Sequence, residues 1–383
     1  MRAWSSLLLA IPLCAFLGCA TAPLPRIEGL LHDELFAPPS KRIAASDAMT
    51  ATPAMKRYLA EHIGSRAHSD DRQNRLVDLL YRDGELKLDY EAAFTRNAAE
   101  AFEARSGNCL SLVMMTGVLA RELGLTVRYQ QVRVDNIWER SGDMVFSIGH
   151  VNLTLSERGS SGLLGVESSL QIDFQPPRRT SSLRYRVFGE STLIAMYLNN
   201  RAAESLSRGQ RDDAYWWARE ALRSDPTYTP AYNTLGVIYR KHGQPALAEA
   251  ALNVALASEP ENPGTMSNLL FALRDQGRAG EAEALAGRLA RLEPNPPYSF
   301  FNQGMAALSA GHVTAARDLF EREVRRAPYN AEFHLWLATV YARLGDLSRA
   351  QSHLAEAIAN SPTRGERELY TAKLARLKAG QAH

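Results

Sequence analysis

Five prolines recur at a fixed interval in the second half of this 383-residue chain. Each lies 34 residues after the one before it: Pro226, Pro260, Pro294, Pro328 and Pro362. Because proline cannot continue the hydrogen-bond ladder of a helix, each one is expected to end a helix. Twelve residues before each proline the sequence has a small residue, where two helices can approach closely: Ala214, Ala248, Ala282, Ala316 and Ala350. The spacing therefore predicts a stack of similar helix pairs.

A period of 34 residues is typical of tetratricopeptide helix pairs. In the second unit, Tyr232, Leu235, Gly236 and Tyr239 match the first-helix pattern of that family, whereas the third unit has Leu270 where the glycine would lie. We expect an all-α tetratricopeptide solenoid of five repeats over residues 195–383, closed by a polar capping helix over residues 363–380.

Tetratricopeptide arrays usually bind a peptide or protein partner in a concave groove lined by the first helix of each pair. In this register the predicted groove residues mix apolar and cationic groups, which suits an extended peptide: Asn199, Asn233, Arg240, Phe271, Arg274, Phe301, Met305 and Arg343. The alternative is that the array only packs against the part of the chain that precedes it.

The N-terminus has the layout of an export signal. A positive start is followed by an apolar stretch too short to span a bilayer, and Gly18 then precedes Cys19. This resembles a bacterial lipoprotein signal, with a leader over 1–18 and acyl chains on Cys19; the alternative is an ordinary secretory signal cut near Ala20 or Ala22. We expect a lipid-anchored protein in the envelope of a Gram-negative-type bacterium, at the periplasmic face of the outer membrane, with a tether over residues 19–51.

The composition indicates no cofactor, metal or nucleic-acid partner. Lys and Arg exceed Asp and Glu by only two, 44 against 42, so no basic surface for nucleic acid is indicated. The first-half histidines His32, His62 and His68 show no metal-ligand spacing with nearby acids. The sequence has neither a phosphate-binding loop nor a dinucleotide fingerprint.

With Cys14 in the leader and Cys19 at the lipidation site, Cys109 has no partner for a disulfide within the chain. Arg105, Gly107 and Asn108 form a turn before it, with Arg105 either bonding backbone carbonyls or solvated. A helix with an apolar face then begins at Cys109 and ends at Gly124. A helix N-terminus favours an anion, which makes a nucleophilic thiolate more available.

Alternating residues after this helix predict antiparallel strands. One strand directs Val151, Leu153 and Leu155 to one face and His150, Asn152 and Thr154 to the other. On a later strand Ile172 is apolar and Asp173 lies opposite. If these strands are neighbours, His150 can deprotonate Cys109 and Asp173 can orient the imidazole. Each residue alone also fits a structural role: packing for the thiol, a satisfied half-buried histidine, a capping carboxylate.

The run Arg-Ser-Gly-Asn-Cys-Leu-Ser-Leu from Arg105, followed by Gly-His-Val at 149–151 and Ile-Asp-Phe at 172–174, resembles the transglutaminase-like superfamily. The resemblance covers about residues 75–190 and implies a papain-like α+β domain, here placed over 52–190, that transfers acyl groups. It implies Cys109 as nucleophile, His150 as base and Asp173 as orienting residue. Arylamine N-acetyltransferases share the Arg-x-Gly-x-Cys core, but their following residues are absent. No oxyanion-hole side chain is identified; Trp138 is near only in sequence.

Three functions compete on these grounds. The first is an envelope cysteine enzyme that transfers acyl groups or hydrolyses amides, with repeats that recruit a protein substrate. The second is a non-catalytic lipoprotein scaffold for protein–protein interaction, in which Cys109 is a packing residue. A peptidoglycan amidase is a third, less favoured because no glycan-binding groove is indicated.

Overall fold

The computed structural model describes residues 27–64, 69–81, 86, 88–91, 94–133, 138–141, 144–147, 149–156, 169–174, 184–361 and 363–379. The predicted leader, Cys19 and Pro362 lie outside these ranges, and so do parts of the loops between the strands. Over the described residues, no helix is both long enough and apolar enough to cross a membrane.

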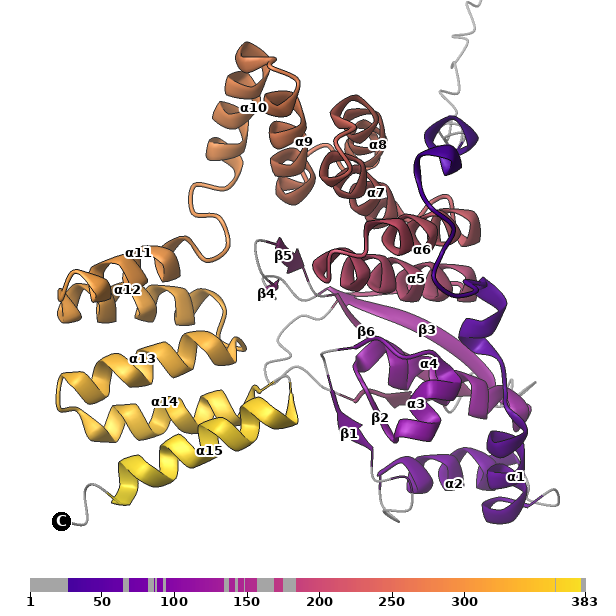
Figure 1. Cartoon of the computed structure of the whole chain (residues 1–383). Coiled ribbons are helices and arrows are strands. Elements are labelled where there is room, and N and C mark those ends of the chain that lie inside the picture. Colours follow the sequence, from indigo (N-terminus) through magenta and orange to yellow (C-terminus); the bar gives the residue numbers. More distant parts are fainter. Residues whose placement is uncertain are drawn as a thin grey trace, which may run out of the picture.

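The first half of the chain combines short helices with strands (Figure 1). A four-stranded antiparallel sheet has the order β7-β6-β3-β8, and two-stranded pairs are formed by β1 with β2 and by β4 with β5. In chain order these elements are η1 Ile27–Leu30, η2 Asp33–Leu35, η3 Ala45–Met49, α1 Pro53–His62, α2 Ser69–Tyr81, β1 Asp89–Tyr90, α3 Ala98–Ala104, β2 Ser106–Gly107, α4 Cys109–Glu122, β3 Thr126–Arg133, β4 Trp138–Ser141, β5 Met144–Ser147, β6 His150–Ser156, β7 Leu170–Ile172 and β8 Arg184–Phe188.

Helix α4 lies at the centre of this half and is buried on nearly every side. Twelve of its fourteen residues are buried, so the prediction of one apolar face is too narrow. The helix contacts β3 and β6. A Cβ at Gly117 would lie 2.5 Å from the Tyr129 hydroxyl, so only glycine lets the helix approach the sheet this closely. Gly124 ends the helix region with φ +77°, as predicted.

The register of the sheet fixes which residues share a face. In the antiparallel pair of β3 and β6, His150 lies opposite Val132 and Asn152 opposite Gln130. The predicted apolar face of β6 is buried, as expected. His150 and Asn152 on the other face are buried as well, which places polar groups where they must find hydrogen-bond partners.

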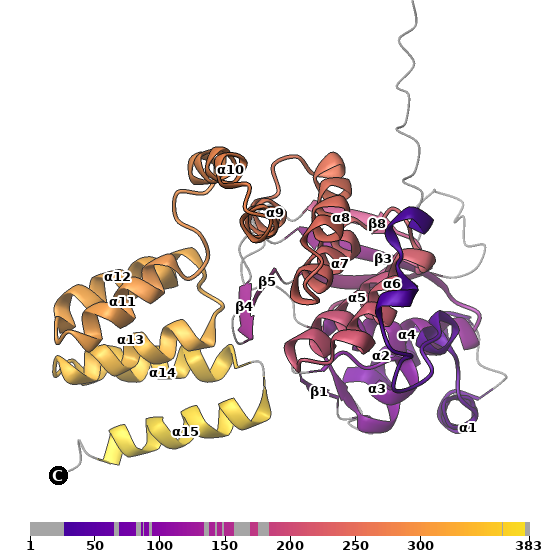
Figure 2. The same ribbon diagram turned by 45° about the horizontal axis from the view of Figure 1, so that its top comes forward.

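The second half is a run of antiparallel helix pairs, which confirms the tetratricopeptide prediction (Figures 1 and 2). The prolines at 226, 260, 294 and 328 each follow the end of a helix by two residues, and the predicted alanine positions are buried. The helices are α5 Glu190–Ser207, α6 Arg211–Ser224, α7 Thr229–Lys241, α8 Pro245–Ser258, α9 Pro263–Asp275, α10 Ala279–Leu292, α11 Ser299–Ser309, α12 Val313–Arg326, α13 Ala331–Arg343, α14 Leu347–Ala359 and the capping helix α15 Arg364–Ala379.

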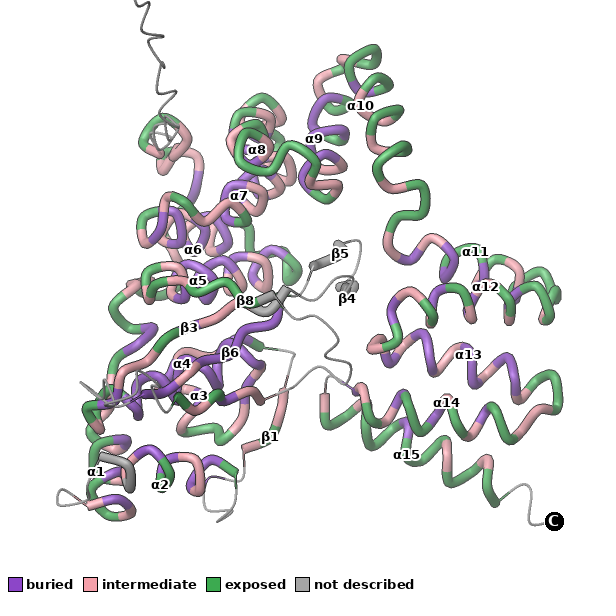
Figure 3. The backbone as a smooth tube through the Cα atoms, turned by 180° about the vertical axis from the view of Figure 1, so that it is seen from behind, coloured by how far each residue is buried: buried purple, intermediate pink, exposed green. Residues whose placement is uncertain are grey.

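The array is divided between its third and fourth helix pairs. One hydrophobic core extends as far as Ala282 on α10, and a separate core begins at Tyr298. Helix α10 buries only Ala282 among its described residues, as the pink and green tube in Figure 3 shows. The linker carries Pro296 and Pro297 after Pro294, and Tyr298 has φ +64°. The five predicted repeats are present as helix pairs, and their buried cores are divided into three pairs followed by two.

Residues 27–49, predicted as part of a tether, instead pack along the first repeats as an N-terminal strap (Ile27–Met49). The Phe36 ring stacks on Tyr215 of α6 with centroids 4.0 Å apart. The Tyr239 hydroxyl on α7 donates to the Leu30 carbonyl at 2.6 Å, and Trp216 donates to the Ala37 carbonyl at 2.7 Å. The strap is held in place by the buried Phe36 side chain and by these hydrogen bonds on either side of it.

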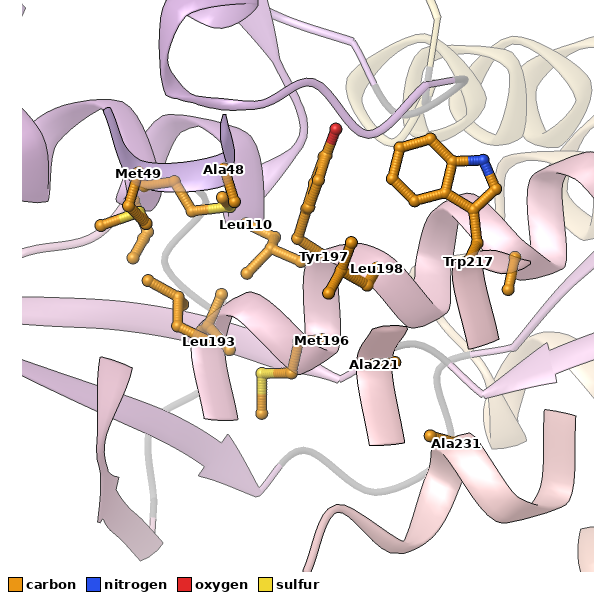
Figure 4. Packing of buried hydrophobic residues seen from close by; sticks show 14 of the residues in the cluster. Ala48, Met49, Leu110, Leu193, Met196, Tyr197, Leu198, Trp217, Ala221 and Ala231 are labelled. Atoms are coloured by element: carbon orange, nitrogen blue, oxygen red, sulfur yellow. The ribbon is translucent and has the colours of Figure 1, made fainter. Parts of the chain in front are cut away.

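Helix α5 joins the two halves of the molecule. Its residues Leu193, Met196 and Tyr197 belong to the same buried cluster as Leu110 of α4 and Met49 of the N-terminal strap (Figure 4). On its other side α5 pairs with α6 as the first helix of the first repeat. The boundary predicted between residues 190 and 195 therefore falls inside a helix that both halves need.

Candidate functional site

Cys109 is the first residue of α4. The side chain of Asn108 caps this helix, because its Oδ1 accepts a hydrogen bond from the Ser111 N–H at 2.9 Å. The thiol is unpaired and 7% exposed. The predicted position of Cys109 at a helix N-terminus is thus the observed one.

The backbone before Cys109 makes a tight turn. Arg105 ends α3 in the left-handed region with φ +51°, and its carbonyl accepts from the Asp89 N–H at 2.9 Å. A Cβ at Gly107 would lie 2.6 Å from Ser111 Cβ, so the chain can pass here only as glycine. All three residues predicted to support the turn lie in it.

His150 and Asp173 are hydrogen-bonded to each other. The His150 Nε2–H donates to Asp173 Oδ1 at 2.8 Å and to Oδ2 at 2.9 Å. Asn152, two residues along β6 from His150, donates from Nδ2 to Asp173 Oδ2 at 3.1 Å. The Tyr81 hydroxyl of α2 donates to the Asp173 backbone carbonyl at 3.1 Å. Two side chains of β6 therefore bind the Asp173 carboxylate, and a side chain of α2 binds the Asp173 backbone.

The electrostatics favour a charged imidazole. Burial alone lowers the pKa of His150, but its hydrogen bonds with Asp173 and with Cys109, together with their charges, raise it to about 9. Burial is also the main cause that raises the pKa of Tyr81 to about 12, and the Asp173 charge adds to it. Since Nε2 faces the carboxylate, Nδ1 is the ring nitrogen left for the sulfur.

The structure thus brings Cys109, His150 and Asp173 together from α4, β6 and the end of β7. A protonated imidazole beside a sulfur can stabilise a thiolate and can later deliver its proton to a leaving group. Among the residues described, no three or more His, Cys, Asp or Glu side chains are placed so that they could hold one metal ion. Trp138 begins β4, and its side chain lies outside the described part.

Sequence reasoning missed two polar residues at this site. Asn152 shares a strand face with His150, so the period-two pattern that selected His150 also points to it. Thr95 is 2% exposed and accepts at Oγ1 from Asn108 Nδ2 at 2.9 Å. Thr95 precedes α3 and belongs to no recognisable sequence motif. Only the tertiary fold brings it into contact with Asn108 in the turn.

Four of the predicted groove residues lie on α7 and α9. On α9, Phe271 is 41% exposed, and the Arg240 guanidinium of α7 lies 5.0 Å from its ring centroid. Arg240 also pairs with Asp275 at 3.3 Å. Asn268 donates to Asn233 Oδ1 at 2.9 Å, and Arg274 is exposed.

Other predicted groove residues lie elsewhere. Phe301 is 2% exposed and packs against Phe320 and Phe333, so it is a core residue of α11. Met305 is half-buried against the same core. Asn199 is buried on α5, and Arg343 is exposed on α13, beyond the division after α10. The eight residues do not line one continuous groove, because the array is divided and one of its aromatics faces inward.

Comparison with known proteins supports the repeats. A tetratricopeptide-repeat family model matches residues 269–331 and 301–365. The type IV pilus assembly protein PilF of Pseudomonas aeruginosa is 30% identical over 122 residues, which is 31% of this chain and 48% of PilF. Cellulose synthase operon protein C of Xanthomonas axonopodis is 28% identical over 163 residues, 40% of this chain and 10% of that protein. The chain therefore spans at most about half the length of these curated relatives.

Solved structures give weaker likenesses. The Pseudomonas aeruginosa PilF structure is 22% identical, with a TM-score of 0.29 over 49% of this chain and 86% of PilF. YrrB, described as a tetratricopeptide protein with an unusual peptide-binding site, is 22% identical with a TM-score of 0.26, over 47% and 92% of the two chains. At these TM-scores the superpositions carry no argument of their own.

Proposed function

We propose that this protein binds a protein or peptide partner through its tetratricopeptide repeats. The repeats themselves are established by the matching family model and by the helix pairs. The surface that carries the proposal is the exposed Phe271 beside Arg240 and Arg274. An exposed aromatic ring flanked by guanidinium groups offers apolar contact together with hydrogen-bond donors for a peptide backbone or carboxylate.

A photo-crosslinking residue placed at Phe271 in the producing bacterium tests this proposal. We expect a discrete adduct of defined mass, lost when Arg240→Ala and Arg274→Ala are combined with it. The matched control carries the same crosslinker at Glu283, an exposed position on α10. Equal adducts from both positions, or none from either, would contradict binding at this surface.

We propose, as a second function, acyl transfer or amide hydrolysis at Cys109. The specific observation in its favour is the bonding of His150 to Asp173 at 2.8 Å beside a free thiol at a helix N-terminus. It agrees with the resemblance of these sequence segments to the transglutaminase-like superfamily. In the alternative, a purely non-catalytic scaffold, these three residues would serve only packing and hydrogen bonding within the fold.

The proposed reaction begins with attack of the Cys109 thiolate on an amide carbonyl carbon. A carbon–sulfur bond forms, the carbon–nitrogen bond breaks, and protonated His150 gives its proton to the leaving amine. Asp173 keeps the imidazole oriented through Nε2. Water or a second amine then attacks the thioester and gives a proton to His150, and the Cys109 thiolate leaves as the carbon–sulfur bond breaks.

Alkylation by iodoacetamide, mapped to Cys109 by peptide mass spectrometry, tests the thiol. We expect alkylation at pH 6.5 to be at least tenfold faster than that of the same thiol in the urea-unfolded protein, and to slow to the unfolded rate in His150→Ala. Indifference to His150→Ala would count against the enzyme. Full complementation of a deletion strain by Cys109→Ser would favour the scaffold alone.

We propose an envelope location for the protein. The apolar leader ending at Cys19 supports export and lipid attachment, and the relative named as a type IV pilus assembly protein is compatible with it. Metabolic labelling with a fatty-acid analogue tests the anchor. The label should depend on Cys19 and be absent from Cys19→Ser.

A further inference from the structure

We infer that Glu204, from the first repeat helix, is a positioning residue for the Cys109 nucleophile, acting through Thr95 and Asn108. This rests on the second proposed function, the thiol chemistry. The proposed link joins the first repeat helix to the thiol. Neither the repeat pattern nor the sequence around Cys109 predicts it.

The link begins at the buried residue Thr95, which α5 holds at three points. Its backbone N–H donates to Glu204 Oε1 at 2.7 Å. Its carbonyl accepts from Arg201 Nη1 at 3.2 Å. Its hydroxyl oxygen accepts from Asn200 Nδ2 at 3.3 Å. Three hydrogen bonds from one helix couple the position of Thr95 to that of α5.

From Thr95 the link continues to the helix that carries the thiol. The Thr95 hydroxyl also accepts from Asn108 Nδ2 at 2.9 Å, while Asn108 Oδ1 accepts from the Ser111 N–H and hydroxyl, both at 2.9 Å. The Arg96 N–H donates to Ser111 Oγ at 2.8 Å. Both ends of the Asn108 amide are engaged, so Thr95 sets the orientation of the cap directly before Cys109.

Glu204 is a charged residue at a position largely shielded from water, where packing alone would favour an apolar side chain. The Glu204 side chain is half-buried, 18% exposed, and its partial removal from water raises its pKa. Arg201 Nε lies 3.5 Å from Glu204 Oε2 and the guanidinium covers the Trp217 ring at 5.1 Å. A buried acid costs stability unless it is paired and bonded. Its shortest bond goes to the backbone of Thr95, which is what fixing a loop requires.

The neighbouring apolar contacts move with the same helix. Leu110, the residue after Cys109, belongs to the buried cluster that contains Leu193 and Tyr197 of α5 (Figure 4). A shift of α5 would therefore act on the start of α4 through packing as well as through Thr95. The first repeat helix is in this sense part of the thiol site.

The test measures the rate of Cys109 alkylation by iodoacetamide, and its pH dependence, in the full chain. Glu204→Ala removes the acceptor of the Thr95 N–H, and Thr95→Val removes the acceptor of Asn108 Nδ2 at similar volume. Each should slow alkylation at pH 6.5 by about fivefold and flatten its pH profile. Glu204→Gln keeps an acceptor oxygen and Thr95→Ser keeps the hydroxyl, so both should restore the native rate and profile.

The matched control is Glu220→Ala on α6, an acid of the same repeat that pairs with Arg219 at 2.9 Å and does not touch Thr95. It should leave the rate unchanged. If Glu204→Ala does not fold, the comparison of Thr95→Val with Thr95→Ser provides the test. Native rates in Glu204→Ala and Thr95→Val, with a slowed His150→Ala, would overturn the positioning role and leave the thiol chemistry intact. A native protein that reacts no faster than its unfolded form would overturn both.

Discussion

Replacing Asp173 with asparagine removes one charge from the buried site and leaves its size almost unchanged. The carboxylate accepts both hydrogen bonds of His150 Nε2, at 2.8 and 2.9 Å. Burial by itself lowers the pKa of His150, and the bonds and charges of Asp173 and Cys109 raise it to about 9. In Asp173→Asn the pKa of His150 should therefore fall by at least one unit. A proton NMR titration, with the His150 signal assigned from its loss in His150→Gln, measures this.

The same shift predicts how stability depends on pH. The pKa of His150 is 6.5 in the unfolded chain and about 9 in the folded one. At 1.36 kcal/mol per pKa unit, protonation of His150 contributes about 3 kcal/mol to the free energy of unfolding. Because the folded pKa is the higher one, this contribution is fully present below pH 6.5 and is lost as pH rises through 9. Urea unfolding at pH 6 and pH 9.5 should show the loss in the native protein, and a smaller one in Asp173→Asn.

The control for the charge change is Asp318→Asn, an exposed aspartate that pairs with its neighbour Arg317 on α12. It should keep the pH dependence of the native protein. A native His150 that titrates at or below 6.5 would refute the argument, because the imidazole would then be neutral where the proposed chemistry needs its proton.

Two further predictions concern packing and capping. A Cβ at Gly236 would lie 2.5 Å from Leu252 Cγ, so Gly236→Ala should lower the free energy of unfolding by about 1–3 kcal/mol; Gly280→Ala on α10, where nothing lies within 4 Å, should instead be neutral or gain up to about 1 kcal/mol. Asn108→Ala should cost about 1–2 kcal/mol by removing the cap of α4, whereas Asn108→Asp keeps an acceptor for the Ser111 N–H and should cost less. Urea unfolding measures all four, and equal effects within either pair would contradict the reasoning.

The repeats could be predicted in detail because their helix ends are set by local chemistry. Proline is tolerated in the first turn of a helix but cannot continue one beyond it, so the five prolines predicted helix ends, and the helices before Pro226, Pro260, Pro294 and Pro328 end two residues earlier. A second ladder in the sequence has the same period: Gly209, Gly243, Gly277, Gly311 and Gly345 all have φ between 73° and 81°. These glycines make the turn inside each pair, which only a residue without a Cβ adopts readily.

The division of the array could not be predicted from its period, because stacking depends on how much apolar surface neighbouring pairs share. Helix α10 is rich in alanine and glycine and buries little. Pro296 and Pro297 then add rigid, extended residues to the linker. The N-terminal strap escaped prediction because its isolated apolar residues have no helical or strand period, and Pro38 and Pro39 are typical of a linker.

At the candidate site, the sequence indicated which residues meet and left open what holds them. Alternation along two strands was sufficient to place His150 and Asp173 on polar faces. The role of Thr95 depends on α5, because Glu204, which accepts its N–H, lies about a hundred residues further along the chain. Sequence periodicity predicts which residues share a face of one helix or strand. It does not predict the contacts between elements that are distant in the sequence.

The buried polar group also bears on the choice between enzyme and scaffold. Replacing a buried ion pair with apolar residues of similar volume is often neutral or stabilising, so such a pair is weak support for a purely structural role. Here His150, Asn152 and Asp173 are joined by three hydrogen bonds beside a free thiol. A scaffold would fold as well with an apolar trio such as Leu, Leu and Val at these positions. We expect this triple variant to be as stable as the native protein at pH 9.5 and to bind its partner. We expect its Cys109 alkylation to fall to the unfolded rate. This result would show that the polar group activates the thiol. If partner binding fails as well, the group serves the scaffold.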